Sequence, residues 1–156
     1  MALIAGIAGA LAMAALDRTL KVFTISHPAV GGVIVDGWLY FRSVANANLA
    51  FGLPFPSAIL PALSGGVIFV FGWWWVAAVY QRAAISVCAL TFIIAGACSN
   101  LIDRVRWGHV VDYIDVPWFT VFNLADVMIT FGVGLLILRE LIRWWQGRVK
   151  IQGNNF

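Results

Sequence analysis

Charged side chains are scarce in this chain. Its 156 residues include ten lysines and arginines and seven aspartates and glutamates, so only 11% of the residues are charged. Soluble domains carry about 25% charged residues and are about half apolar. Here 62% of the residues are hydrophobic and the mean hydropathy is +0.92. The composition excludes an ordinary soluble domain and predicts an integral membrane protein with a single domain, residues 1–156.

The sequence also has few of the residues that bind metals or nucleic acids. Cys88 and Cys98 lie ten residues apart in one uncharged run, about 15 Å along a helix axis, which excludes a disulfide between them. His27 and His109 lie far from both cysteines, so no cluster with metal-ligand spacing is present and no metal is expected. No exposed segment interleaves basic and aromatic residues, and we therefore expect no nucleic-acid partner.

Four apolar segments have about the 20 residues that a membrane-spanning helix needs. We expect transmembrane helices at about residues 2–25, 57–80, 83–103 and 122–145. The uncharged run of the first helix is too short to span a membrane alone, so we expect this helix to continue through the charged residues near its end. A signal peptide is the alternative interpretation of that segment, but the positive n-region of such a peptide is missing. The predicted fold class is therefore an all-α membrane protein with four transmembrane helices.

Two stretches between these helices are rich in aromatic and β-branched residues and are bounded by turn residues. Residues 28–56 and 104–119 are predicted to form short strands, a small β-rich cradle on one side of the membrane. Both termini and the turn at residues 81–82 fall on the other side. Positive charges do not orient the chain, because five lie on each side. They are Arg82, Arg139, Arg143, Arg148 and Lys150 on the terminal side, and Arg18, Lys21, Arg42, Arg104 and Arg106 on the other.

Several of the seven acidic residues lie in or beside the apolar segments, and at membrane depth an uncompensated carboxylate costs a few kcal/mol. Asp17 has Lys21 one helical turn away on the same face. This pair is either a simple ion pair at the helix mouth or one that also organises a site. Asp103 and Arg104 close the third apolar segment, and we expect them to lock the helix end to the strands.

Asp112 and Asp126 have no such partner in the sequence. Asp126 lies thirteen residues before Arg139, which is about 20 Å of helix. If Arg139 reaches one membrane interface, Asp126 lies at or just inside the opposite interface, beside the strand-like stretch that carries Asp112. Two neighbouring carboxylates resist ionising together, and such a pair activates a water and protonates a leaving group. Proton relays and ion sites also use buried carboxylates. Asp115, expected to be exposed on the same stretch, is interpreted as a surface or supporting residue.

Five short stretches occur in an order and at spacings typical of one family. LDRTLK resembles its D-x-x-x-K motif, NANLAFG its N-x-G-A-A-F motif, and GACSNLIDR its G-x-x-x-N-x-x-D-R motif. GHVVDYIDV and FNLAD resemble the two stretches that carry its catalytic aspartates. Any one match is weak, but five in order resemble the lipoprotein signal peptidases (signal peptidase II) of bacteria.

The resemblance implies a role for each matching residue. The catalytic aspartates fall on Asp112 and Asp126. The substrate-binding and supporting positions fall on Asp17, Lys21, Asn46, Gly96, Asn100, Asp103, Arg104, Asn123 and Ala125. Three positions depart from the family's pattern: Asn48 and Leu49 replace glycine and alanine, and Ser99 stands where glycine often precedes the asparagine.

The resemblance also implies a location and a reaction. It implies four helices with cytoplasmic termini in the bacterial cytoplasmic (inner) membrane, and an active site at the periplasmic or outer face. The substrate is a prolipoprotein carrying a diacylglyceryl group, cut just before its lipid-modified cysteine without a metal or organic cofactor. Membrane lipids are the other expected partners, and a monomer is expected. A proton-coupled transporter and a structural scaffold are the alternatives, but no internal repeat favours a transporter.

Overall fold

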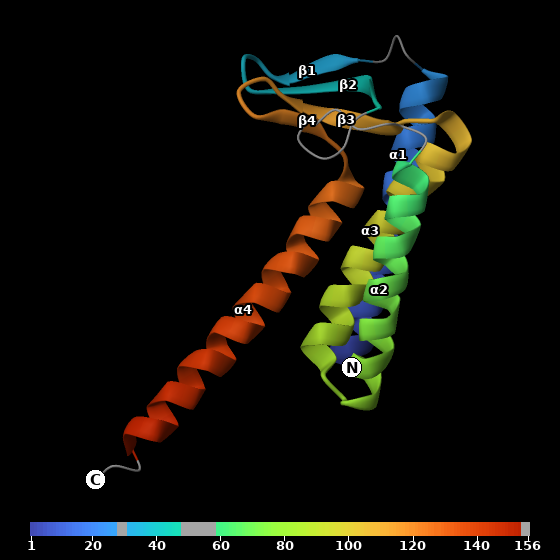
Figure 1. The fold of residues 1–156 in the computed structure, drawn as a ribbon. Helices are drawn as coiled ribbons and strands as arrows, with labels where there is room; N and C mark the ends of the chain where they lie inside the picture. The colour runs from blue at the N-terminus through green and yellow to red at the C-terminus, as the bar shows by residue number, and fades with distance from the viewer. Residues whose placement is uncertain (28–30, 48–58, 154–156) are drawn as a thin grey trace.

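The computed structural model describes residues 1–27, 31–47 and 59–153. Within them lie helices α1 (Ala2–Ser26), α2 (Leu60–Tyr80), α3 (Ala84–Trp107) and α4 (Leu124–Gly153), and strands β1 (Gly32–Val35), β2 (Leu39–Asn46), β3 (Val110–Val116) and β4 (Thr120–Phe122). The strands form one antiparallel sheet in the order β1-β2-β3-β4. Figure 1 shows this sheet across one end of the helices, with the start of α1 and the end of α4 at the other.

Three of the described helices are long and apolar enough to cross a membrane. Their qualifying segments are Leu3–Ser26, Leu60–Tyr80 and Ala84–Trp107. Large apolar side chains cover the outside of α2, where Phe69 and Trp73 are 74% and 75% exposed. Such exposure would be unfavourable in water and is favourable in lipid. The prediction of a mainly helical membrane protein with a small sheet is confirmed at this level.

The helix ends differ from those expected. α3 continues to Trp107, so residues 104–107 are helical and not strand-like. The helix ends at Gly108, whose φ of 75° closes the last turn, and Arg104 and Arg106 in that turn suit the negative end of the helix dipole. α4 likewise continues past residue 145 to Gly153. Charge marks where an apolar segment ends, but a helix continues into water where its backbone permits.

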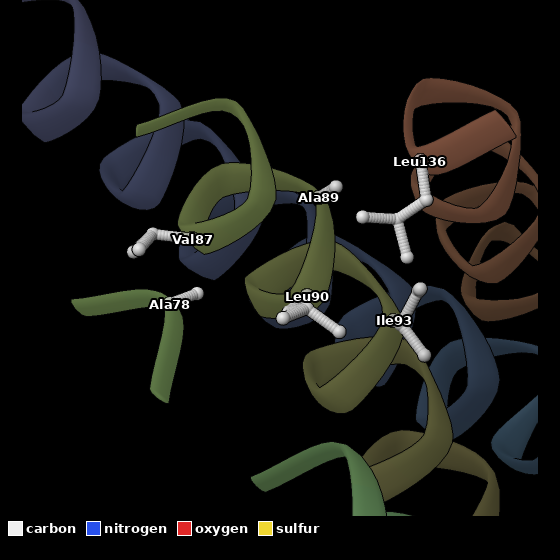
Figure 2. Close-up of a cluster of buried hydrophobic side chains, with 6 residues drawn as sticks. All are labelled: Ala78, Val87, Ala89, Leu90, Ile93 and Leu136. Atoms are coloured by element: carbon white, nitrogen blue, oxygen red, sulfur yellow. The ribbon is translucent and has the colours of Figure 1, made fainter. Parts of the chain in front are cut away.

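The central element of the core is α3. Figure 2 shows a cluster in which Ala78 of α2 and Leu136 of α4 pack from two sides against α3, which contributes Val87, Ala89, Leu90 and Ile93. A second cluster joins Ala10 of α1 to Phe92 of α3 and Met128 of α4. The helix α3 contacts all three other helices and β3, and its end nearest the sheet carries the buried Asn100 and Asp103.

Two glycines allow α3 and α4 to pack closely. A Cβ atom on Gly96 would lie 2.5 Å from the carbonyl oxygen of Ala125, and one on Gly132 would lie 2.5 Å from that of Ala89. Small residues at such crossings permit close backbone approach in lipid. Gly96, which matches the family's third motif, is therefore a packing position. Its lack of a side chain allows the start of α4 to lie close to α3.

Replacing Gly132 with alanine tests this packing. The new methyl group meets the Ala89 oxygen and, at 2.6 Å, Cγ1 of Ile93, so the two helices must separate at a cost of about 1–3 kcal/mol. We expect Gly132→Ala to lower the melting temperature in detergent. The control is Gly134→Ala, where nothing lies within 4 Å and alanine favours the helix. Equal melting temperatures for the two variants would contradict close α3–α4 packing.

Candidate active site

The N-terminus of α4 forms the first part of the site. The side-chain oxygen of Asn123 accepts a hydrogen bond from the backbone N–H of Asp126 at 3.0 Å, and Oδ2 of Asp126 accepts one from the backbone N–H of Asn123 at 3.3 Å. This reciprocal pair is a capping box, with aspartate in the place that glutamate or glutamine usually takes. It fixes the carboxylate of Asp126 at the positive end of the helix dipole, where negative charge is favoured.

Asp112 reaches the same point from β3. Asn46 of β2 lies opposite Val110, so its side chain is a diagonal neighbour of Asp112, and its Nδ2 donates to Oδ2 of Asp112 at 2.9 Å. Nδ2 of Asn123 donates to Oδ1 of the same carboxylate at 2.6 Å. Asn123 thus contacts both aspartates, one through its side chain and the other through its capping box. The two carboxylates that the sequence analysis singled out are joined through one asparagine.

The environment of Asp112 changes its acidity. Burial raises the pKa of Asp112 to about 6, and the nearby Asp126 carboxylate adds to the increase, while the hydrogen bonds from Asn46 and Asn123 oppose it. The side chain is 1% exposed. A carboxyl with this pKa exchanges its proton near neutral pH, as a general acid or base must.

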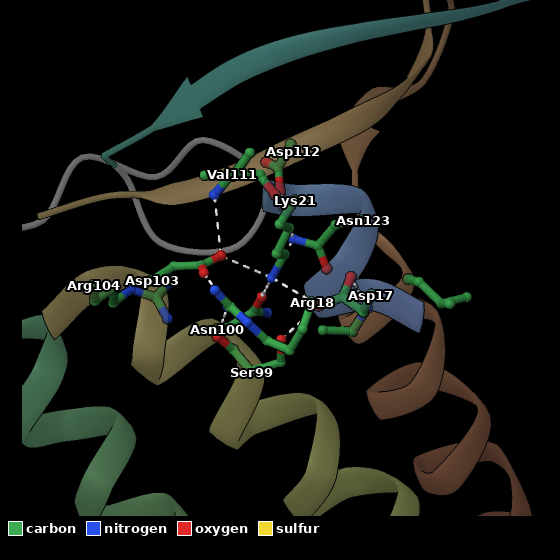
Figure 3. Close-up of polar contacts among 12 residues, drawn as sticks. Asp17, Arg18, Lys21, Ser99, Asn100, Asp103, Arg104, Val111, Asp112 and Asn123 are labelled. Atoms are coloured by element: carbon green, nitrogen blue, oxygen red, sulfur yellow. Dashed lines mark hydrogen bonds and ion pairs between the residues drawn. The ribbon is translucent and has the colours of Figure 1, made fainter. Parts of the chain in front are cut away.

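Asn100 of α3 connects the second aspartate to a buried cation. Its Nδ2 donates to Oδ1 of Asp126 at 2.8 Å, and its Oδ1 accepts from Nζ of Lys21 at 2.8 Å and from Nδ2 of Asn123 at 3.3 Å. The lysine therefore fixes which way the Asn100 amide faces. Figure 3 shows the side chains of α1 and α3 converging beneath β3, with Lys21 between Asp103 and Asn100.

Four charged side chains form a neutral cluster behind the aspartate pair. Lys21 lies 3.0 Å from Asp17 and 2.8 Å from Asp103, and all three are fully buried. Arg18 pairs with the other oxygen of Asp103 and donates to the backbone oxygen of Ser99 at 3.1 Å. Asp103 also accepts from the backbone N–H of Val111 at 3.3 Å, which ties the end of α3 to β3 as expected. Two acids and two bases balance, as burial in low dielectric requires.

Asp17 does more than pair with Lys21. Its Oδ2 accepts from the hydroxyl of Ser99 at 2.5 Å, and its Oδ1 accepts from the hydroxyl of Tyr113 at 2.9 Å and from the backbone N–H of Ala125 at 3.1 Å. The carboxylate therefore joins α1, α3, β3 and the first turn of α4. Of the two interpretations of the Asp17–Lys21 pair, these contacts favour the one in which it also organises a site.

The structure places some predicted residues differently. Asp115 is 5% exposed and pairs with Arg42 Nε at 2.6 Å, so the interpretation of Asp115 as an exposed residue is wrong. The reason is the register: β2 pairs with β3 here, and Arg42 lies diagonally across from Asp115. Arg104 donates to Ser64 of α2 at 3.4 Å, so within the described residues its side-chain hydrogen bond ties α3 to α2 instead of to the sheet. The departures Asn48 and Leu49 lie outside the described residues.

Sequence reasoning missed three residues that the cluster uses. Arg18, Ser99 and Tyr113 were not assigned roles, yet each contacts a carboxylate of the cluster. Ser99 was noted only as a departure from glycine, and its hydroxyl proves to be a donor to Asp17. An arginine beside Asp17, one residue along the helix, was the one available signal. In the described part of the chain, no group of three or more histidine, cysteine, aspartate or glutamate side chains is placed to hold a metal ion.

Comparisons with known proteins agree with this arrangement. A family model described as signal peptidase (SPase) II matches residues 9–142. The lipoprotein signal peptidase of Chlorobaculum tepidum is 33% identical over 149 residues, covering 83% of this chain and 89% of that protein. The lipoprotein signal peptidase of Bartonella quintana is 34% identical over 144 residues, covering 87% of this chain and 86% of that protein.

A solved structure has the same fold. It is titled "Bacterial membrane enzyme structure by the in meso method at 2.3 A resolution" and superposes with a TM-score of 0.76. It is 26% identical and the match covers 88% of this chain and 87% of that one. The resemblance carried by the five motifs is thus confirmed: the chain belongs to the signal peptidase II family, a family of aspartic proteases.

Proposed function

We propose that this protein removes the signal peptide from diacylglyceryl-modified prolipoproteins, cutting just before the lipid-modified cysteine, and that Asp112 and Asp126 catalyse the cleavage. The observation that carries the proposal is the contact of Asn123 with both carboxylates. Carboxylates held together in this way are the working groups of aspartic proteases. The relatives' name, lipoprotein signal peptidase, supports the substrate class.

The proposed reaction needs one proton shared by the pair. Like charges at close range cannot both ionise easily, so one carboxyl keeps its proton while the other is ionised. The ionised carboxylate takes a proton from a water, which attacks the scissile carbonyl, and the protonated carboxyl donates to the carbonyl oxygen. The roles then exchange, and the amine leaves with a proton as the C–N bond breaks.

The surroundings of the pair suit a peptide substrate. The amides of Asn46, Asn100 and Asn123 are the candidates to hydrogen-bond the substrate backbone, which lipid cannot satisfy. Nε of Arg104 is buried without a hydrogen-bond partner in the described part of the chain, which makes the guanidinium a further donor for a substrate carbonyl.

We also propose that α4 is a fourth transmembrane helix. Its 30 residues extend about 45 Å, and apolar side chains such as Phe131, Ile137 and Leu138 face outward. With four spans, both termini lie on one side of the membrane, and the sheet and the aspartate pair lie on the other. As the family resemblance implies, the proposed orientation has cytoplasmic termini and an active site at the periplasmic face of the bacterial inner membrane. This location suits the reaction, because a signal peptide and a diacylglyceryl group both stay in the bilayer while the cleaved bond must meet water.

The direct test replaces each aspartate. We expect Asp112→Asn and Asp126→Asn to fold and to lose at least about a thousandfold in cleavage of a diacylglyceryl-modified prolipoprotein, because each removes a proton-transfer group. Cleavage is followed by gel mobility and folding by thermal melting in detergent. Asp115→Asn is the matched control, since it removes a carboxylate from the same strand outside the pair. Near-normal cleavage by either aspartate variant would overturn the assignment of that residue.

The raised pKa of Asp112 predicts how stability depends on pH. Because its pKa is about 6 in the folded protein and 3.8 ordinarily, the folded state binds the proton more tightly than the unfolded state. This contribution to stability is fully present below the ordinary value and is lost as the pH rises through about 6. Asp112→Asn cannot titrate there, so its melting temperature relative to the wild type should rise between about pH 4 and about pH 8. A constant or falling difference would contradict the raised pKa.

Asp17→Asn separates the supporting cluster from the chemistry. The change leaves Lys21 with one buried carboxylate instead of two, and breaking a buried pair in this way costs about 3–5 kcal/mol. The amide oxygen still accepts from Tyr113 and Ala125. We therefore expect a clear fall in melting temperature and a turnover per folded molecule close to that of the wild type. Lost turnover at an unchanged melting temperature would contradict this prediction.

A further inference from the structure

Tyr113 stands directly after Asp112 on β3 and, among the side chains that the structure describes, is the largest that is fully buried. Its hydroxyl donates to Oδ1 of Asp17 at 2.9 Å and accepts from the backbone N–H of Leu124 at 3.1 Å. One oxygen atom therefore contacts both α1 and α4. Successive side chains leave a strand on opposite sides, so Tyr113 and Asp112 extend from β3 in different directions.

The contact with Leu124 is unusual for the start of a helix. Leu124 is the first residue of α4, and the N–H groups of a helix's first turn have no partner within the helix. A side chain just before the helix usually satisfies one of them, as Asn123 does for Asp126. The N–H of Leu124 is satisfied by a side chain from a strand eleven residues earlier in the chain.

This contact links the two aspartates by a second route. Tyr113 adjoins Asp112 in the sequence, and Leu124 lies two residues before Asp126. The hydroxyl therefore fixes the start of α4 against β3 through a contact separate from those of Asn123. Asp17 completes the link, because the oxygen that accepts from Tyr113 also accepts from the N–H of Ala125 at 3.1 Å.

The hydroxyl is well suited to a fixed role. Burial raises the pKa of Tyr113 above its ordinary value, and the Asp17 carboxylate acts in the same direction. The hydroxyl therefore keeps its proton at neutral pH and donates a hydrogen bond to Asp17. Its ring also contacts Phe41, with centroids 5.8 Å apart, so the ring supports the sheet whether or not the hydroxyl is present.

We propose that Tyr113 is a positioning residue for the aspartate pair: its hydroxyl fixes the first turn of α4 against β3 and so sets how Asp126 meets Asp112. This inference rests on the proposed function, because it assigns Tyr113 a part in the reaction of that pair. The hydroxyl acts through Leu124 and Asp17 and touches neither catalytic carboxylate in the contacts described.

Tyr113→Phe keeps the ring and removes only the hydroxyl. Small misplacements of reacting groups lower rates strongly, so we expect kcat for the lipidated prolipoprotein to fall by roughly 10- to 100-fold with KM unchanged. The control is Tyr40→Phe, the same chemical change on β2, where the hydroxyl bonds the N–H of Gly37 in the turn between β1 and β2. Rates are divided by the folded fraction from thermal melting, so a stability effect alone leaves kcat at the wild-type value.

A wild-type kcat per folded molecule in Tyr113→Phe, as in Tyr40→Phe, would overturn the positioning role. Should Tyr113→Phe not fold, Leu124→Pro removes the other partner, because proline suits the first position of a helix and has no N–H. The same fall in kcat is expected there, and an unchanged kcat would again overturn the proposal. If the wild type itself does not cleave the lipidated substrate, the proposed function fails. If the wild type cleaves and both variants match it, only the role of Tyr113 fails.

Discussion

The ammonium group of Lys21 lies fully buried where α1, α3 and β3 meet, and the arrangement of the site depends on how that charge is balanced. A lone cation there would be expensive in lipid or in protein. Asp17 and Asp103 supply the countercharges, and Arg18 compensates the second carboxylate. Because these residues come from α1 and α3, neutralising the lysine also fixes those two helices against each other. The polar partners then hold the sheet and α4.

The start of α4 links this charge balance to the two aspartates of the proposed active site. A helix that begins in a buried place has unpaired N–H groups, which must find acceptors. In this protein the hydroxyl of Tyr113, the carboxylate of Asp17 and the side chain of Asn123 each accept one. The helix therefore starts only where those three acceptors meet, and the carboxylate of Asp126 is brought to Asn123 and Asn100 as a result. The hydrogen bonds that begin the helix therefore also place Asp126, one of the two aspartates proposed to catalyse cleavage.

Much of this could be predicted from the sequence, because the signals are local. Long apolar runs indicate membrane helices, and carboxylates such as Asp112 and Asp126 without nearby cations are conspicuous in so apolar a chain. The order of the motifs predicted the family, which the comparisons confirm. That membership favours a peptidase over the transporter and scaffold that the residues alone left open.

The features that escaped prediction depend on contacts between distant parts of the chain. The partner of Asp115 follows from the pairing of β2 with β3, which no local pattern specifies. The hydroxyl of Tyr113 reaches Asp17 across 96 positions of sequence, and Ser99 reaches it across 82. The end of α3 at Trp107 depends on the backbone at Gly108 and not on the charge that ends the apolar run. Side-chain roles of this kind become visible only once the elements are placed in space.

The most direct test of the account is cleavage of a diacylglyceryl-modified prolipoprotein by the purified protein in detergent, with the unlipidated form alongside. Mass spectrometry of the products identifies the bond that is cut. We expect the lipidated form alone to be cut, immediately before its modified cysteine. A folded wild-type protein that cuts neither form, or that cuts elsewhere, would contradict the assignment of Asp112 and Asp126 as a lipoprotein signal peptidase pair.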